Sequence, residues 1–239
     1  MNYDLIRNRA TIMIKEGSAE WNIDTDNLCI DGVAYRLMPW HYNKNLKSLR
    51  NLSVDSASVG GLCSYKATRI ETKTADIGKL IYSELDLCRW LTDDEITTVY
   101  ALSSSDKTMS MMLKTSKGIL CSIDIATTLS EETTPISKHE ITGTEGMISD
   151  RCINEHIPSS DIYVFVDSKK DPTTYVDLDV HVAGLSPEEA YVTENIVKLV
   201  ESREYRETTL KNHRAVMKLI DAVKYSIESG EVVISEEKA

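Results

Sequence analysis

Glycine, proline and long apolar runs are all scarce in this chain of 239 residues. With 10 glycines and 5 prolines, it is not a collagen-like, low-complexity or linker-rich protein. Its longest apolar runs are only a few residues long, so we expect no membrane-spanning helix. No basic and then apolar leader opens the chain, so we expect no secretion.

Positive charge is also in deficit. Lysine and arginine number 27 against 38 aspartates and glutamates, which leaves a formal net charge of −11. Binding to a phosphate backbone needs a basic surface, and we find no basic stripe that overturns the average. We therefore expect neither a nucleic acid nor a membrane as a partner.

The common cofactor and metal motifs are missing. No two of the glycines are separated by a single residue, so the dinucleotide fingerprint G-x-G-x-x-G is impossible, and no P-loop occurs. The five cysteines are scattered without a C-x-x-C pair, and no histidines have the H-E-x-x-H spacing. We therefore expect no metal site, no bound cofactor, and reduced thiols in a cytoplasmic protein.

Hydrophobic periodicity predicts a helix followed by a run of strands. Residues 77–91 carry apolar side chains at helical spacing, whereas residues 119–126 and 175–182 alternate between apolar and polar, as half-buried strands do. Ser186 and Glu189 form a capping box at the start of a later helix. The other expected elements are helices in 4–16 and 39–52, strands in 32–38, 62–72, 96–102, 109–114, 136–141, 162–166 and 231–235, and a last helix that ends at Gly230.

Successive strands with short connections, and helices segregated from them, are typical of the α+β class. We expect a mostly antiparallel meander, an open-faced sheet with its helices packed on one face.

Two groups of polar residues invite a functional interpretation. Asp177, Asp179 and His181 share one face of an expected strand, where they could hold an ion, or form a solvated outer face or a subunit interface.

The second group lies on the predicted helix 77–91. Tyr82, Ser83 and Asp86 could line a pocket, but helical spacing favours a structural interpretation, with an intrahelical pair of Asp86 and Arg89 and Trp90 in the core. Ser83 has no base near it in the sequence, so a nucleophilic role has little support.

Several strings, in order along the chain, resemble the glucose-fructose oxidoreductase, inositol dehydrogenase and rhizopine catabolism (Gfo/Idh/MocA) family of oxidoreductases. The strings are DLCRWLTDDEITTVYA at 86–101, KGILCSID at 117–124, HEITGTEG at 139–146, and the closing helices at 191–200 and 216–234. The likeness covers about residues 33–236 and only the C-terminal α+β domain of that family. It implies that residues 33–239 form this domain and that residues 1–32 are a short helix and strand segment, a remnant of a Rossmann domain.

The resemblance also implies what is absent. Members begin with a nucleotide-binding domain of ~120 residues, about one ordinary domain, for which residues 1–32 are too few. The family's catalytic helix carries an Asp and a His four residues apart, where this chain has Lys79 and Ser83, and only the later Asp86 is retained. We therefore expect no catalytic residue and no dehydrogenase activity from this chain alone.

Three hypotheses follow. The chain is an oligomerisation or sugar- or polyol-binding module, a homo-oligomer through the open sheet face and Asp177, Asp179 and His181. Alternatively, it is the substrate-domain subunit of a two-chain dehydrogenase, in which a separate Rossmann chain supplies NAD(P). The candidate substrate residues would then be Tyr35, Arg36, Tyr82, Ser83 and Asp86. The third hypothesis is an unrelated binding protein of the α+β class.

Overall fold

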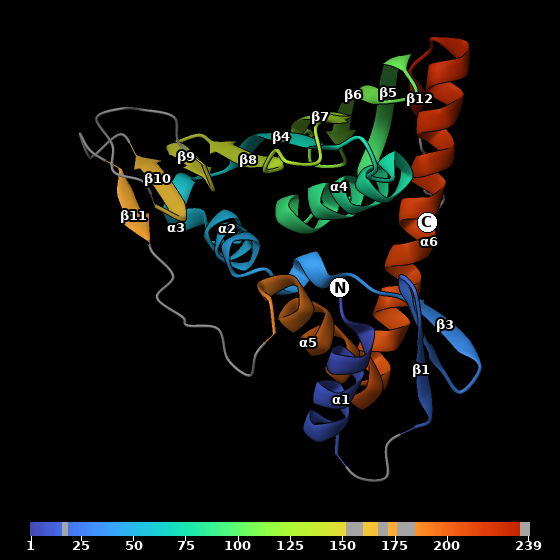
Figure 1. Ribbon diagram of the computed structural model, residues 1–239. Helices are drawn as coiled ribbons and strands as arrows, with labels where there is room; N and C mark the ends of the chain where they lie inside the picture. Colours follow the sequence, from blue (N-terminus) through green and yellow to red (C-terminus); the bar gives the residue numbers. More distant parts are fainter. Residues whose placement is uncertain (16–18, 152–159, 167–171, 176–184, 235–239) are drawn as a thin grey trace. The chain divides into compact units, whose positions relative to one another are not determined.

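Two compact units make up the chain (Figure 1). The computed structural model describes residues 1–15, 19–151, 160–166, 172–175 and 185–234. The first unit comprises Met1–Lys47 and Leu178–Ala215, and the second comprises Ser48–Asp177 and Val216–Ala239. The predicted division at residue 33 lies inside the first unit and stays a prediction, because packing does not report on the loss of a domain.

The first unit combines a small antiparallel sheet with helices. Its strands pair in the order β1 (Trp21–Asp24), β2 (Asn27–Ile30) and β3 (Val33–Arg36), and the short 3-10 helix η1 (Pro39–Tyr42) follows them. The sheet packs with α1 (Tyr3–Met13) and α5 (Pro187–Glu201) around one core. That core contains Ile6, Ala10, Leu28, Ile30, Tyr35, Leu37, Val192, Ile196, Leu199 and Val200.

Local capping explains where the helices of this unit begin. The Asn2 side chain accepts a hydrogen bond from the Leu5 backbone N–H at the start of α1. The predicted capping box of α5 is confirmed, because Ser186 and Glu189 each accept from the backbone N–H of the other. Hydrogen bonds from the backbone N–H groups of Asn2 and Ser186 lower the pKa of the Glu189 carboxyl, which keeps the cap ionised.

A nine-stranded sheet dominates the second unit. Its order is β11-β10-β9-β8-β4-β7-β6-β5-β12, and every neighbouring pair is antiparallel except β4 with β7. The strands are β4 (Leu62–Thr72), β5 (Ile96–Ser105), β6 (Thr108–Thr115), β7 (Leu120–Leu129), β8 (Ile136–Gly143), β9 (Gly146–Ser149), β10 (Ile162–Val166), β11 (Thr173–Tyr175) and β12 (Val233–Ile234). The unit also contains the short helix α3 (Ser56–Val59). Two of its three boundaries with the first unit fall within α2 (Lys44–Val54) and α6 (Arg203–Ser229).

One face of this sheet is buried by α4 (Ile77–Thr92), which packs against β4 and β7 (Figure 1). Alternation along the strands produces the two faces. On β7, Cys121 and Ile123 are buried under the helix side of the sheet. Leu120 points to the opposite face and is 62% exposed. Met112 on β6 is exposed on the same open face as Leu120, so the sheet is amphipathic, with an uncovered side that is partly apolar.

The predicted α+β class with a mostly antiparallel, open-faced sheet is confirmed. The helix expected at 77–91 is α4, and the strands expected at 62–72 and 162–166 are β4 and β10. The sheet consists of two meanders, β5-β6-β7 and β8-β9-β10-β11, with β4 inserted between β8 and β7 and parallel to β7. Most of the strand predicted at 175–182 lies outside the described residues. None of the helices in the described part of the chain is both long and apolar enough to cross a bilayer.

Two glycines allow close backbone approach at the turn between β8 and β9. A Cβ added to Gly143 would collide with the carbonyl of Val59, and one added to Gly146 would collide with the carbonyl of Phe165. These glycines belong to the H-E-I-T-G-T-E-G string, so its glycines allow the turn to pack closely against α3 and β10.

We predict that Gly143→Ala lowers the free energy of unfolding by about 1–3 kcal/mol, because the new methyl group must displace the backbone at Val59. Urea unfolding measures the change. Gly61→Ala is the matched control, since a Cβ there meets only the Thr144 side chain at 4.0 Å. Equal stability of the two variants would contradict the packing argument.

Candidate functional site

Helix α4 carries three of the candidate substrate residues. It begins at Asp76, whose carboxylate accepts from the N–H groups of Gly78 and Lys79, and its apolar stripe packs on the sheet. Tyr82 and Asp86 are almost fully buried, at 4% and 1% exposed. Ser83 is half-buried and donates its hydroxyl proton to the Leu80 carbonyl in the same helix, at 3.0 Å.

The other two candidates lie in the first unit, next to each other on β3. Tyr35 is part of the core of that unit. Arg36 forms an ion pair with Asp26, at 3.4 Å. The five candidate substrate residues are thus divided between the two units, and their common role stays a prediction. Asp177, Asp179 and His181 lie outside the described residues.

Arg89 on α4 has a partner that helical spacing did not suggest. Its Nε and Nη2 atoms donate to the two carboxylate oxygens of Glu95, at 2.7 and 2.6 Å. This bidentate pair crosses the end of the helix, where Asp93 adopts the left-handed conformation. A guanidinium that is 7% exposed needs such a partner.

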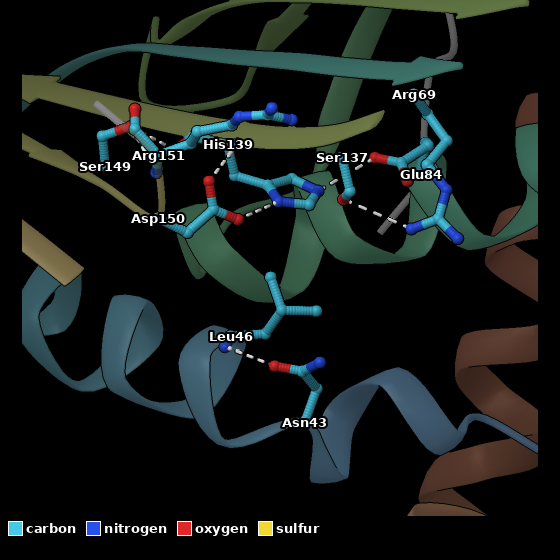
Figure 2. Close-up of polar contacts among 9 residues, drawn as sticks. All are labelled: Asn43, Leu46, Arg69, Glu84, Ser137, His139, Ser149, Asp150 and Arg151. Atoms are coloured by element: carbon cyan, nitrogen blue, oxygen red, sulfur yellow. Dashed lines mark hydrogen bonds and ion pairs between the residues drawn. The ribbon is translucent and has the colours of Figure 1, made fainter. Parts of the chain in front are cut away.

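A buried ionic cluster in the second unit was missed by sequence reasoning. Figure 2 shows the ring of His139 on β8 between the carboxylates of Asp150 and Glu84. Nδ1 is 2.7 Å from Asp150 and Nε2 is 3.4 Å from Glu84, and the Tyr65 ring stacks on the imidazole with centroids 6.3 Å apart. The available signal was that His139 shares the inward face of its strand with Ile141.

The uncovered face of the sheet is hollowed across β4, β5, β6 and β7. The hollow has a volume of about 460 Å³. Its apolar floor includes Met112 and Leu120, and Lys66 and Lys114 also line it, with Tyr100 and Ser122. A concave, largely apolar surface with a few polar groups suits a ligand or a protein partner.

The chain was compared with known protein families, curated sequences and solved structures. No sequence profile of a known family matches the chain, and no curated protein sequence matches it. Solved structures do match. Levoglucosan dehydrogenase in complex with NADH and levoglucosan is 15% identical, with a TM-score of 0.63 over 84% of this chain and 66% of that one.

Two further oxidoreductase structures match to a similar extent. Myo-inositol 2-dehydrogenase from Lactobacillus plantarum is 17% identical, with a TM-score of 0.59 over 83% of this chain and 64% of that one. An oxidoreductase from Agrobacterium radiobacter, in complex with NAD+, L-tartaric acid and magnesium, is 15% identical, with a TM-score of 0.62 over 82% and 63%.

The fold is that of the Gfo/Idh/MocA-type oxidoreductases. The resemblance inferred from the strings in the sequence is thereby confirmed for the fold. The chain spans less than two-thirds of the length of each of these three structures.

We predict that Ser83→Ala changes the free energy of unfolding by less than about 0.5 kcal/mol, because the hydroxyl bonds only within its own helix. Ser53→Ala is the matched control and should cost about 1 kcal/mol, since that buried hydroxyl donates to the Leu91 carbonyl at 2.7 Å. Both are measured by urea unfolding. A larger loss for Ser83→Ala than for Ser53→Ala would show that Ser83 belongs to a wider network.

Proposed function

We propose that this chain is a non-catalytic oligomerisation and sugar- or polyol-binding module built on an oxidoreductase fold. The observation that carries the proposal is the match to sugar and polyol dehydrogenases, combined with the loss on α4 of the acid–base pair that the resemblance implies. Lys79 and Ser83 stand at those two positions. Hydride transfer needs a general acid–base group near the substrate hydroxyl, and Ser83 bonds to its own helix instead.

Self-association through the open face of the sheet is the first part of the proposal. Leu102, Met112 and Leu120 are 52%, 64% and 62% exposed on that face. Apolar surface of this kind is stabilised when a second copy covers it. The apolar hollow between Lys66 and Lys114 gives the face a shape against which a partner can pack.

Polyol binding is the second part. Asp86 is a buried carboxylate on α4, and carboxylates accept hydrogen bonds from sugar hydroxyls strongly. We therefore retain Tyr82, Ser83 and Asp86 as candidate polyol-contacting residues of the second unit, and Tyr35 and Arg36 as separate candidates in the first unit. The four described cysteines are free thiols, which is consistent with a cytoplasmic location.

We predict that the chain forms a dimer at micromolar concentration and that Leu120→Lys dissociates it, because a third positive charge beside Lys66 and Lys114 repels the partner's face. Sedimentation velocity measures the mass, which should fall to the monomer's 26.8 kDa. Ile12→Lys is the matched control, since Ile12 is 75% exposed on α1 and should leave the dimer intact. A wild-type monomer would exclude this part of the proposal.

We predict that calorimetric titration detects myo-inositol or levoglucosan but neither NADH nor NADPH. Asp86→Asn should weaken polyol binding by about tenfold, because a charged acceptor is replaced by a neutral one of the same shape. Glu140→Asn, on the outer face of β8, is the control. Micromolar binding of NADH would contradict the proposal and restore a dehydrogenase function.

A two-chain dehydrogenase is the second candidate function. It is favoured by the match to oxidoreductase structures that were solved as complexes with NADH or NAD+. A separate nucleotide-binding chain would then supply NAD(P) to the substrate side. Polyol-dependent reduction of NAD+ on mixing the two chains would favour this candidate over the binding module.

A further inference from the structure

The cluster around His139 joins three elements of the second unit. His139 lies on β8, Glu84 on α4, and Asp150 directly after β9. Their side chains are 2%, 1% and 11% exposed. Charged groups removed from water in this way are costly unless they compensate one another.

The contacts determine which atoms carry protons. Asp150 holds His139 twice, because one carboxylate oxygen accepts from the backbone N–H and the other lies 2.7 Å from Nδ1. The opposite ring nitrogen, Nε2, faces a carboxylate oxygen of Glu84 at 3.4 Å. A neutral imidazole has a single N–H, so one of its nitrogens would present a lone pair to a carboxylate. Only the doubly protonated ring donates a hydrogen bond to two ionised carboxylates at once.

The surroundings favour the same charge state. Burial lowers the pKa of His139, but the hydrogen bonds and charges of Asp150 and Glu84 outweigh it and raise that pKa to about 10. Tyr65 stacks on the ring, and burial raises the pKa of its hydroxyl. The thiol of Cys88 on α4 also has a raised pKa, through its hydrogen bond with Cys121 on β7 and through burial. Tyr65 and Cys88 are thus neutral and do not compete with His139 for the carboxylates.

We propose that His139 is a buried imidazolium that ties α4 to the β8–β9 hairpin, and that removal of its proton at alkaline pH releases the helix. Without that proton, Glu84 and Asp150 are left as two buried negative charges around a neutral ring. Their repulsion and their lost hydrogen bond act on α4 and on the end of β9 (Figure 2). The tie does not depend on the proposed function, because it concerns how the helix is held and not what it binds.

The sign of the pH dependence follows from the direction of the shift. The pKa of His139 is raised above its ordinary 6.5, so the folded state binds the proton more tightly than the unfolded state. The resulting stabilisation is complete below about pH 6.5 and is lost as the pH rises towards about 10. Between about pH 7 and 9, one retained proton makes the unfolding equilibrium constant rise by up to about tenfold per pH unit.

The first measurement is urea unfolding of the full chain at several values between about pH 7 and 9. Asp150→Asn keeps the shape of the side chain but removes the charge that holds the proton, so the rise with pH should fall to less than half. Glu140→Gln is the matched control, on β8 beside His139. It breaks the Lys138–Glu140 pair, at 3.0 Å and partly exposed, and should leave the pH dependence unchanged.

Two further measurements test the helix and the ring directly. Amide hydrogen exchange of residues 77–92, corrected for its intrinsic pH dependence, should accelerate by more than about tenfold between about pH 7 and 9. In the wild-type chain, ¹⁵N chemical shifts should show both ring nitrogens of His139 protonated at about pH 8. This NMR measurement needs no variant, so it decides the question even if Asp150→Asn does not fold.

A neutral His139 ring at about pH 8 would overturn the proposal. So would the same pH dependence of unfolding in the wild type and in a folded Asp150→Asn or Glu84→Gln variant. A failure of polyol binding or of self-association would overturn the proposed function but would leave these three results unaffected.

Discussion

The packing of α4 against the nine-stranded sheet is the constraint on which the second unit depends. Ten of the sixteen residues of this helix are buried, and Glu84, Asp86 and Arg89 are among them. Apolar contacts alone would tolerate small shifts of the helix, but buried charges need partners at defined distances. Arg89 is bound by Glu95 at one end of the helix and Glu84 faces His139 on the sheet. The position of α4 over the sheet is therefore set by ionic geometry as well as by its hydrophobic stripe.

The two faces of the same sheet differ because of the alternation of its strands. On β7, Ile123 and Ile125 lie under α4, whereas Leu120 and Asp124 point away from it and are exposed. An exposed face with apolar side chains is unfavourable in water unless something covers it. The same alternation thus provides the buried face that packs against α4 and the exposed apolar face through which we propose that the chain self-associates.

The proposed module differs from a dehydrogenase at the helix where the chemistry would occur. The fold match leaves the frame of the helix and sheet in place, while Ser83 bonds within its own helix and Lys79 stands where the resemblance expects an acid. The residues that hold α4 are distinct from Lys79 and Ser83. Fold and function are independent in this sense.

Local features of this protein were predictable from the sequence by itself. The periodicity of residues 77–91, the capping box of Ser186 and Glu189, and the extent of β4 depend on neighbours within one element. The family strings also indicated the fold, although the two compact units and the strands β1 and β2 were not foreseen. Only the tertiary structure showed that β4 runs parallel to β7 and that His139 meets Glu84 from 55 residues away. Such pairings depend on how elements pack against one another, and a sequence pattern records which face of an element is buried but not which side chain it meets there.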